Sequence, residues 1–306
     1  FGLTATPTKE HRGLLEPIGD MEFRIINKSP NKKEIISRTG WFGSITHYEL
    51  GTLENEKQTV DVFRDHLDNL FEFNEYYGAK RVGMIICERD NGVGGWGIDN
   101  VMDMIGHYFL PRNLLNTDEG LIAVMTAEYK GYVRLCRKPG RALGTWDDNK
   151  FLRFENPKSE EQMIEDLNDP NHPCKLLLVI EKGKAGMNVL PLKSTFSFRN
   201  TDKKSSAKFD NEPITETARQ IMGRMMRIFT GEDKSSFVKK YGYDLKKYIS
   251  FLNSTERKAL LEINSFDLYV PNNKMWIDAV REVSNELCPS KTEASSWMSK
   301  IKKVTQ

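Results

Sequence analysis

The chain has 306 residues, of which 39% are hydrophobic and 29% charged, and its formal net charge is +2. This composition excludes the fibrous and disordered classes and leaves room for about two globular domains. The small net charge gives no global attraction to nucleic acid, so any such binding must come from local basic patches.

The four cysteines lie far apart with no C-x-x-C pair, so the sequence predicts neither a zinc site nor a disulfide framework. We therefore expect no metal site in this chain and a reducing, intracellular, cytoplasmic location. No apolar run approaches the roughly 20 residues of a membrane span, so we expect no membrane partner. The first residues, FGLTATPTKE, show no signal-peptide pattern and begin as if inside a strand. We expect the chain to be a piece of a longer protein.

Four short apolar runs predict buried strands, at residues 81–87, 121–126, 175–181 and 194–199. Their lack of polar alternation is typical of a parallel sheet covered on both faces. Helical patterns lie beside them at residues 57–77 and 98–110, and a capping box at Ser159–Gln162 opens another helix. This alternation predicts an α/β domain over residues 35–230, with a parallel sheet flanked by helices.

The remaining segments differ from that pattern. Residues 231–306 are rich in lysine, with helical patterns at 235–252, 255–263, 274–287 and 292–303. We expect a helical C-terminal extension there. Residues 1–34 are assigned to the end of a preceding domain and a linker.

A polar stripe marks the helix expected at residues 217–229, TARQIMGRMMRIF. Gln220, Arg224 and Arg227 stand four and then three positions apart, so they line one face. Two guanidinium groups on one face can neutralise the charge that spreads over a phosphoryl group during transfer, which is the role of an arginine finger. The alternative is a surface stripe whose arginines pair with nearby acids such as Glu216. The Met and Ile residues around the stripe are expected to be core.

Two further segments are expected at strand ends, where ligands gather in α/β sheets. In residues 181–189, EKGKAGMNV, Gly186 lets a backbone approach a ligand closely, and Asn188 offers both a donor and an acceptor. The alternative for this stretch is an ordinary strand-end turn. In residues 2–7, GLTATP, Thr4 and Thr6 supply two hydroxyl groups.

In order and spacing, TATP, KAGMNV and QIMGRMMR resemble three motifs of the superfamily 2 helicases and translocases. QIMGRMMR fits the signature Q-x-x-G-R-x-x-R. With Gln at its start it is closer to the DExH, type III restriction-like and phage DNA helicases than to the DEAD-box RNA proteins. The resemblance covers residues 1–230 and implies the C-terminal half of such an enzyme, with the second RecA-like domain at 35–230.

The resemblance implies where ATP would lie. In such enzymes ATP sits between two RecA-like domains, so Arg224 and Arg227 would contact its terminal phosphate. Gln220 would help to order that contact or the attacking water. Gly186 and Asn188 would lie near the nucleotide, where many relatives have Asp in place of Asn.

The resemblance also implies partners. Thr4 and Thr6 would couple the nucleotide state to the binding of nucleic acid. The nucleic acid is expected to be DNA, with RNA as the alternative. A phosphate loop, G-x-x-x-x-G-K-[ST], and an acidic pair for Mg²⁺ do not occur in the 306 residues. In the family both precede TATP, so an upstream RecA-like domain would supply them and bind most of the ATP and Mg²⁺. We expect this fragment alone to be inactive.

A glycine-rich stretch supports a competing interpretation. Residues 92–97, GVGGWG, match G-x-G-x-x-G between a strand and a helix, as in dinucleotide-binding Rossmann domains. Four residues separate the strand from Gly92, no acid closes a strand about 20 residues later, and Trp96 lies inside the loop. We favour a flexible loop. A third interpretation is a degenerate RecA-like module that binds nucleic acid or protein without turnover.

Residues 129–146, YKGYVRLCRKPGRALGTW, contain five cations and no acid, with Tyr and Trp between them. Cations that follow phosphates and aromatic faces that stack on bases form a single-strand binding surface. On this basis we assign nucleic-acid contacts to Lys130, Arg134, Arg137 and Arg141. A solvated basic loop or hairpin is the equal alternative.

Overall fold

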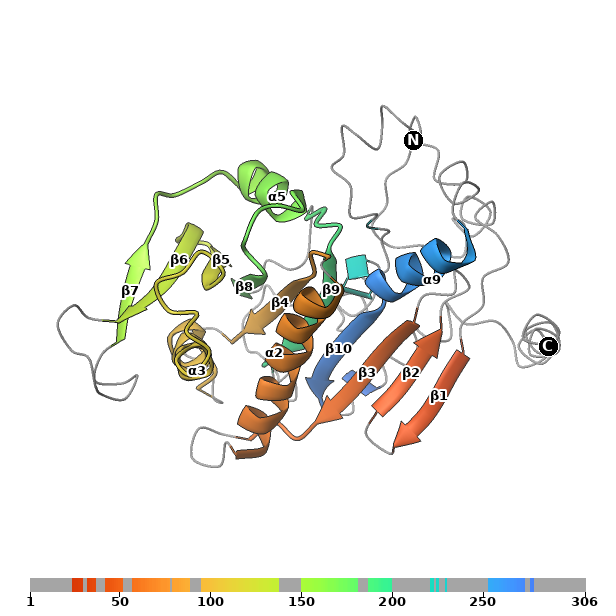
Figure 1. Ribbon diagram of the computed structural model, residues 1–306. Coiled ribbons are helices and arrows are strands. Elements are labelled where there is room, and N and C mark those ends of the chain that lie inside the picture. The colour runs from red at the N-terminus through yellow and green to blue at the C-terminus, as the bar shows by residue number, and fades with distance from the viewer. Residues whose placement is uncertain are drawn as a thin grey trace, which may run out of the picture.

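The computed structural model describes residues 24–29, 32–36, 42–51, 57–77, 79–88, 95–137, 150–180, 187–199, 221–222, 224–225, 229, 253–272 and 276–277. These residues form an α/β fold around one sheet (Figure 1). Its strands are β1 (Arg24–Ser29), β2 (Lys32–Ile36), β3 (Phe42–Tyr48), β4 (Val82–Cys87), β5 (Leu121–Met125), β6 (Lys130–Arg137), β7 (Lys150–Phe154), β8 (Leu176–Ile180), β9 (Leu192–Ser197) and β10 (Phe266–Pro271). Its longer helices are α2 (Lys57–Tyr77), α3 (Ile98–Phe109), α5 (Glu160–Asn168) and α9 (Ser254–Ile263).

The sheet has a parallel centre and antiparallel edges. The strand order is β1-β2-β3-β10-β9-β4-β8-β5-β6-β7. Every neighbouring pair from β3 to β5 is parallel, whereas β1-β2-β3 and β5-β6-β7 pair antiparallel. Such mixed sheets are common among large α/β folds. The predicted α/β class, with a mostly parallel sheet and flanking helices, is confirmed.

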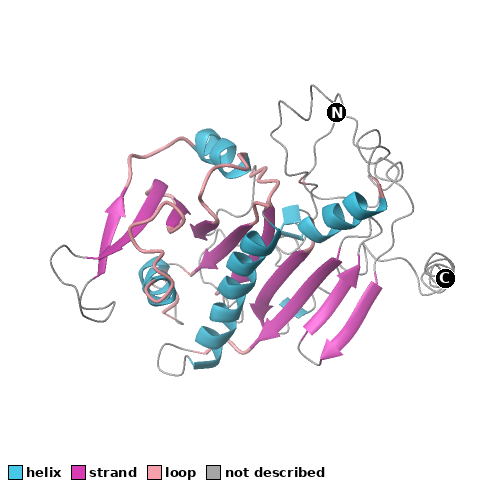
Figure 2. Ribbon diagram, in the orientation of Figure 1, coloured by secondary structure: helices cyan, strands magenta, loops and turns pink. Residues whose placement is uncertain are grey.

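Both faces of the central strands are covered, which explains why their sequences lack polar alternation. In β4 all six residues are buried. Met84 and Ile86 belong to one hydrophobic cluster, and Ile85 and Cys87 belong to another on the opposite face. Helices α2 and α3 cover the second of these faces (Figure 2).

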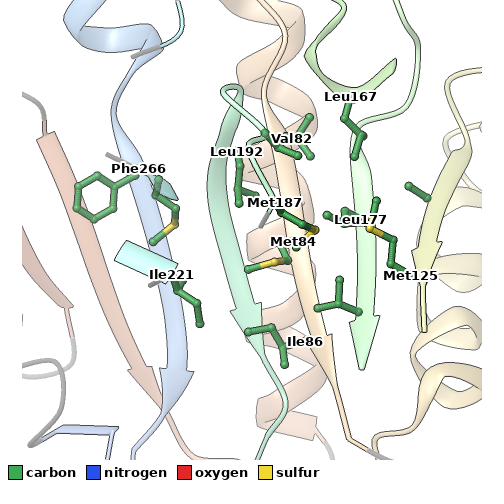
Figure 3. Close-up of a cluster of buried hydrophobic side chains, with 14 of the residues drawn as sticks. Val82, Met84, Ile86, Met125, Leu167, Leu177, Met187, Leu192, Ile221 and Phe266 are labelled. Carbon is green, nitrogen blue, oxygen red and sulfur yellow. The ribbon is translucent and has the colours of Figure 1, made fainter. Parts of the chain in front are cut away.

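The first face is covered by α5 and by Ile221, Met222 and Met225 (Figure 3). On this face, side chains from β4, β8, β9 and β10 pack against those of the covering segments. The buried members drawn in Figure 3 include Val82, Met84, Leu167, Leu177, Met187, Leu192, Ile221 and Phe266. This cluster is the setting of the candidate site.

Helix α5 begins and ends with specific caps. Ser159 Oγ accepts from Gln162 N, and Gln162 Oε1 accepts from Ser159 N, both at 3.2 Å, so the predicted capping box is confirmed. At the other end Lys80 Nζ donates to the carbonyl oxygens of Asp166 (3.0 Å) and Asp169 (2.7 Å). A cation is favoured at a helix C-terminus. Lys80 therefore ties α5 to the segment that leads into β4.

The sheet extends beyond the residues predicted to form it. β10 comes from the region expected to be a helical extension, yet it lies between β3 and β9 in the middle of the sheet. β2 spans the expected boundary at residue 34, and the pair β6-β7 forms one edge. Helix α9 matches the helix expected at 255–263. The other helices expected after residue 231 lie mainly outside the described residues.

Within the described part of the chain, no helix is long and apolar enough to cross a membrane. Cys87, Cys136 and Cys174 are buried free thiols. Cys288 lies outside the described residues.

Candidate functional site

The structure describes some of the predicted site residues and not others. Arg224, Asn188, Lys130 and Arg134 are described in full, and Arg137 by its place in β6. Outside the described residues lie Gln220, Arg227, Gly186, Thr4, Thr6 and Arg141. The roles assigned to that second group stay predictions.

Residues 221, 222, 224 and 225 are helical and are called the Arg224 turn below. Ile221, Met222 and Met225 are at most 1% exposed and belong to the cluster of Figure 3. Their prediction as core is confirmed. Arg224 is itself only 1% exposed. The alternative of a solvent-exposed stripe is therefore wrong for Arg224.

Beneath this turn, β9 is unusually polar for a central strand. Lys193, Thr195 and Ser197 are all 0% exposed. Lys193 Nζ donates to the carbonyl oxygen of Met225 at 3.0 Å, which places that side chain on the side of the Arg224 turn. Alternation along the strand places Thr195 and Ser197 on this side too. The face of β9 on which the Arg224 turn packs is therefore polar, and the Lys193 ammonium bonds the backbone of that turn.

A single amide fixes the chain just after the Arg224 turn. Asn264 follows α9 and is 0% exposed. Its Nδ2 donates to the Phe229 carbonyl and its Oδ1 accepts from the Phe229 N–H, both at 2.8 Å. Nδ2 also donates to the Leu260 carbonyl at 2.8 Å. The amide thus satisfies both backbone groups of a buried residue. Sequence reasoning missed this contact, because Asn after a helix indicates only where the helix ends.

Asn188 lies at the amino ends of the strands. Its carbonyl accepts from Asn168 Nδ2 at 2.7 Å, and Asn168 is the last residue of α5. Two residues further on, Leu190 N donates to Asn168 Oδ1 at 2.7 Å. The Pro191 carbonyl then accepts from Val82 N, at the start of β4. This corrects the expectation that Asn188 stands at a strand's carboxyl end: by residue 187 the chain has already returned to the opposite edge.

Two motif segments that are far apart in the sequence meet at this edge. The apolar residues of KAGMNV and of QIMGRMMR share one buried cluster, through Met187, Val189, Ile221, Met222 and Met225. Lys193 links the two, since it follows the first segment closely and bonds the second. The start of β9 is therefore the place where the fold brings these motifs together.

The basic stretch contains cations that already have acidic partners. Lys130 Nζ lies 2.9 Å from Glu160 Oε2. Arg134 lies 2.8 Å from Asp118 and 3.4 Å from Glu155. A phosphate contact by either side chain would have to compete with these acids. Their assignment to nucleic acid stays a prediction.

The aromatic residues of the same stretch differ in exposure. Tyr132 is 3% exposed, and its hydroxyl donates to Asp166 Oδ2 at 2.9 Å, so its ring has no open face for a base. Tyr129 is partly buried, and its hydroxyl donates to the carbonyls of Tyr132 (2.9 Å) and Glu155 (3.0 Å). Trp146 lies outside the described residues.

The second half of the glycine-rich stretch is packed into the core. Trp96 is 0% exposed and stacks on Phe198 with ring centroids 5.2 Å apart. Its indole N–H donates to the Gly51 carbonyl at 2.8 Å. Its backbone carbonyl accepts from Glu88 N at 3.0 Å, just after β4. Trp96 therefore anchors the return from β4 to α3, a structural role rather than a cofactor contact.

His66 lies on the buried face of α2 and has a strongly lowered pKa. Its Nδ1 lies 3.0 Å from Ser194 Oγ, whereas its buried Nε2 has no hydrogen-bond partner among the residues that the structure describes. Burial lowers the pKa of His66 to about 3, with Asp267 opposing and Arg81 reinforcing the shift. The ring packs against Phe196 and Tyr269 with no opening to solvent, so this Ser–His contact belongs to the core.

We expect the buried His66 to make the fold acid-sensitive. In the unfolded chain the His66 imidazole is protonated near pH 6.5, whereas in the folded chain it stays neutral down to about pH 3. Stability is thus present above pH 6.5 and falls as the pH drops, by up to about 1.4 kcal/mol per pH unit. Urea unfolding of the wild type and of His66→Gln, from about pH 7 to about pH 4, measures the free energy of unfolding as a function of pH. We expect a weaker pH dependence for the variant. Parallel profiles would show that His66 does not titrate in this way, since His172 contributes equally to both proteins.

In the described ranges, no group of three or more His, Cys, Asp or Glu side chains could hold a metal ion. No protein-family model matches the chain, and no curated protein matches it.

Proposed function

We propose that this chain is the C-terminal half of an ATP-dependent helicase or translocase of superfamily 2, with a second RecA-like domain built on the sheet. One observation carries the proposal: KAGMNV and QIMGRMMR, which resemble two motifs of that family, pack in one buried cluster at the start of β9.

In this proposal, ATP and Mg²⁺ are held mainly by an upstream RecA-like domain, and this chain supplies the groups that complete the site. Arg227 stabilises the charge on the terminal phosphate, and Gln220 orders that contact or the water. Arg224 is buried, so its main contribution is to hold the turn in one geometry, which keeps the polar stripe preorganised. Asn188 lies at the amino ends of the strands and is given no nucleotide contact, whereas Gly186 lies near the nucleotide, and Thr4 and Thr6 couple ATP to nucleic acid.

The rival enzyme class, a Rossmann-type dinucleotide binder, is less well supported. Its fingerprint needs an open glycine loop beside the ligand, whereas Trp96 fills the core beneath this one. The non-catalytic RecA-like module shares the fold and differs in activity alone.

ATP turnover with and without single-stranded DNA tests the proposal. The 306-residue chain by itself is expected to hydrolyse no ATP above background, because the phosphate loop and acidic pair are missing from it. The full-length enzyme, meaning this chain joined to its upstream RecA-like domain, is expected to turn over ATP faster when DNA is added. Repurified 1–306 with undiminished turnover would contradict a shared site. DNA binding without turnover by the full-length protein would favour the non-catalytic module.

A further inference from the structure

We propose that Lys193 and Asn264 are positioning residues, which fix the backbone on both sides of Arg227 and so direct its guanidinium toward the phosphate. The inference rests on the proposed function, because Arg227 has a phosphate to stabilise only in that enzyme. In this assignment neither residue contacts ATP. They act through Met225 and Phe229, the described residues that flank Arg227 in the sequence.

The helix of the Arg224 turn ends between Met225 and Phe229, since the first of these residues is helical and the second is not. In a continuing α-helix the N–H of residue 229 would donate to the carbonyl of residue 225. Here the Phe229 N–H donates to Asn264 Oδ1 at 2.8 Å, and the Met225 carbonyl accepts from Lys193 Nζ at 3.0 Å. Side chains from two other parts of the fold therefore take up both halves of that helical hydrogen bond.

Both of these side chains belong to well-packed parts of the fold. Lys193 and Asn264 are 0% exposed. Lys193 is in β9, which lies between β10 and β4 within the sheet. Asn264 follows α9 and is bonded to that helix, because its N–H and its Nδ2 both donate to the Leu260 carbonyl, at 3.1 and 2.8 Å. Groups held by packed helices and strands are positioned more accurately than groups on free loops. Residues 226–228 therefore run between two anchored points.

A structural role for Lys193 is the alternative that a test must exclude. The last carbonyls of a helix have no partner within the helix and carry partial negative charge, so an ammonium is favoured there. Lys80 makes the same kind of contact, with the carbonyls of Asp166 and Asp169 at the end of α5. Lys193 differs in its place, because the helix end that it binds leads directly into Arg227.

Helix α2 offers a matched control for Asn264. Asn74 Oδ1 accepts from the Arg81 N–H at 2.8 Å, and its Nδ2 donates to the carbonyls of Arg81 (3.2 Å) and Leu70 (2.7 Å). These are the same three kinds of hydrogen bond that Asn264 makes, although Asn74 is only partly buried. They hold the segment that leads into β4, to which the proposed function assigns no role. Asn74→Ala therefore removes equivalent bonds away from Arg227.

Hydrogen exchange of the 306-residue chain, followed by mass spectrometry, tests the anchoring itself. Lys193→Met keeps the length of the side chain and removes the ammonium group, and Asn264→Ala removes the amide. Both variants should speed exchange in the peptide that contains the Phe229 amide. Exchange in β5 serves as the reference for opening of the whole fold. Asn74→Ala should leave the Phe229 peptide as it is in the wild type.

Turnover of the full-length enzyme tests the role toward Arg227. At a temperature where every variant is folded, kcat should fall on the order of 10²-fold in Lys193→Met and in Asn264→Ala, as for a group displaced by about 1 Å. The Kd for ATP should stay nearly unchanged, and Asn74→Ala should keep the wild-type kcat. Adding Lys193→Met to Arg227→Ala should lower kcat no further, because a residue that acts through Arg227 has no effect once Arg227 is gone. Loss of stability alone would instead lower kcat in both backgrounds.

Several results would overturn the inference. Unchanged exchange around Phe229 in both variants would show that the backbone is held by other contacts. Normal kcat in a folded Lys193→Met enzyme, or a double variant as slow as the product of the single losses, would remove the role toward Arg227. Lys193→Gln, with a shorter side chain, replaces Lys193→Met if that variant does not fold. A full-length wild type without turnover would defeat the proposed function and this role together, whereas turnover in the wild type that is unaffected in the variants would defeat this role alone.

Discussion

Arg227→Ala in the full-length enzyme is expected to lower ATP turnover about 10³-fold or more, the range for a lost arginine finger. Binding of ATP should stay nearly intact, because in the proposed enzyme the phosphate loop of an upstream domain would provide most of the ground-state contacts. Arg227→Lys should not restore turnover, since one ammonium group cannot reproduce a planar guanidinium with paired donors. The measurement is turnover at saturating ATP and DNA, with ATP affinity determined in parallel.

Arg224 provides the matched comparison on the same helix. Arg224→Ala should also lower turnover strongly, and the double variant should be little worse than either single one, because groups that act as a unit are not additive. The two arginines should differ in stability. Arg224 is 1% exposed, so its replacement by Ala leaves a cavity in the core and should lower the melting temperature.

Normal turnover in a folded Arg227→Ala enzyme would end the helicase assignment for this helix. A loss of turnover that follows the melting temperature in both variants would indicate a purely structural helix. A loss at 227 without destabilisation is the outcome that the arginine-finger role requires.

The largest effect on stability is expected at Asn264. Asn264→Ala removes the three hydrogen bonds of the amide and leaves the N–H and carbonyl of Phe229 buried without partners. Each unsatisfied buried group costs about 1–3 kcal/mol, so the free energy of unfolding should fall by about 2–5 kcal/mol. Urea or thermal unfolding of the 306-residue chain measures the change. Because the bonds hold the chain just after the Arg224 turn, turnover of the full-length enzyme should fall as well.

Asn253, at the other end of α9, is the matched control. It is exposed, and it exchanges hydrogen bonds with Glu256, accepting at 2.9 Å and donating at 2.8 Å. This is an ordinary N-cap, for which replacement by alanine costs about 1 kcal/mol. If Asn264→Ala lowers the free energy of unfolding no more than Asn253→Ala does, water or another group satisfies the backbone of Phe229. The Asn264 hydrogen bonds would then not stabilise the fold as expected.

Local sequence patterns are enough to predict the parts of the fold that depend on them. Four central strands, the helices α2, α3 and α5, and the capping box at Ser159 followed from apolar runs, helical spacing and side-chain chemistry. These elements can be predicted because a buried parallel strand must be apolar on both faces and the apolar residues of an amphipathic helix must recur at every turn. The apolar side chains of the Arg224 turn were identified as core for the same reason.

Which distant residues meet can be seen only in the folded chain. β10 is a short run far along the chain, and its place between β3 and β9 depends on pairing with strands that local periodicity cannot identify. The same limit applies to charge. The sequence predicts a phosphate contact for Arg224, which is buried. It predicts nucleic-acid contacts for Lys130 and Arg134, which are paired with Glu160 and Asp118. A side chain's surroundings are set by segments brought together on folding, so its exposure and its partners are properties of the whole fold.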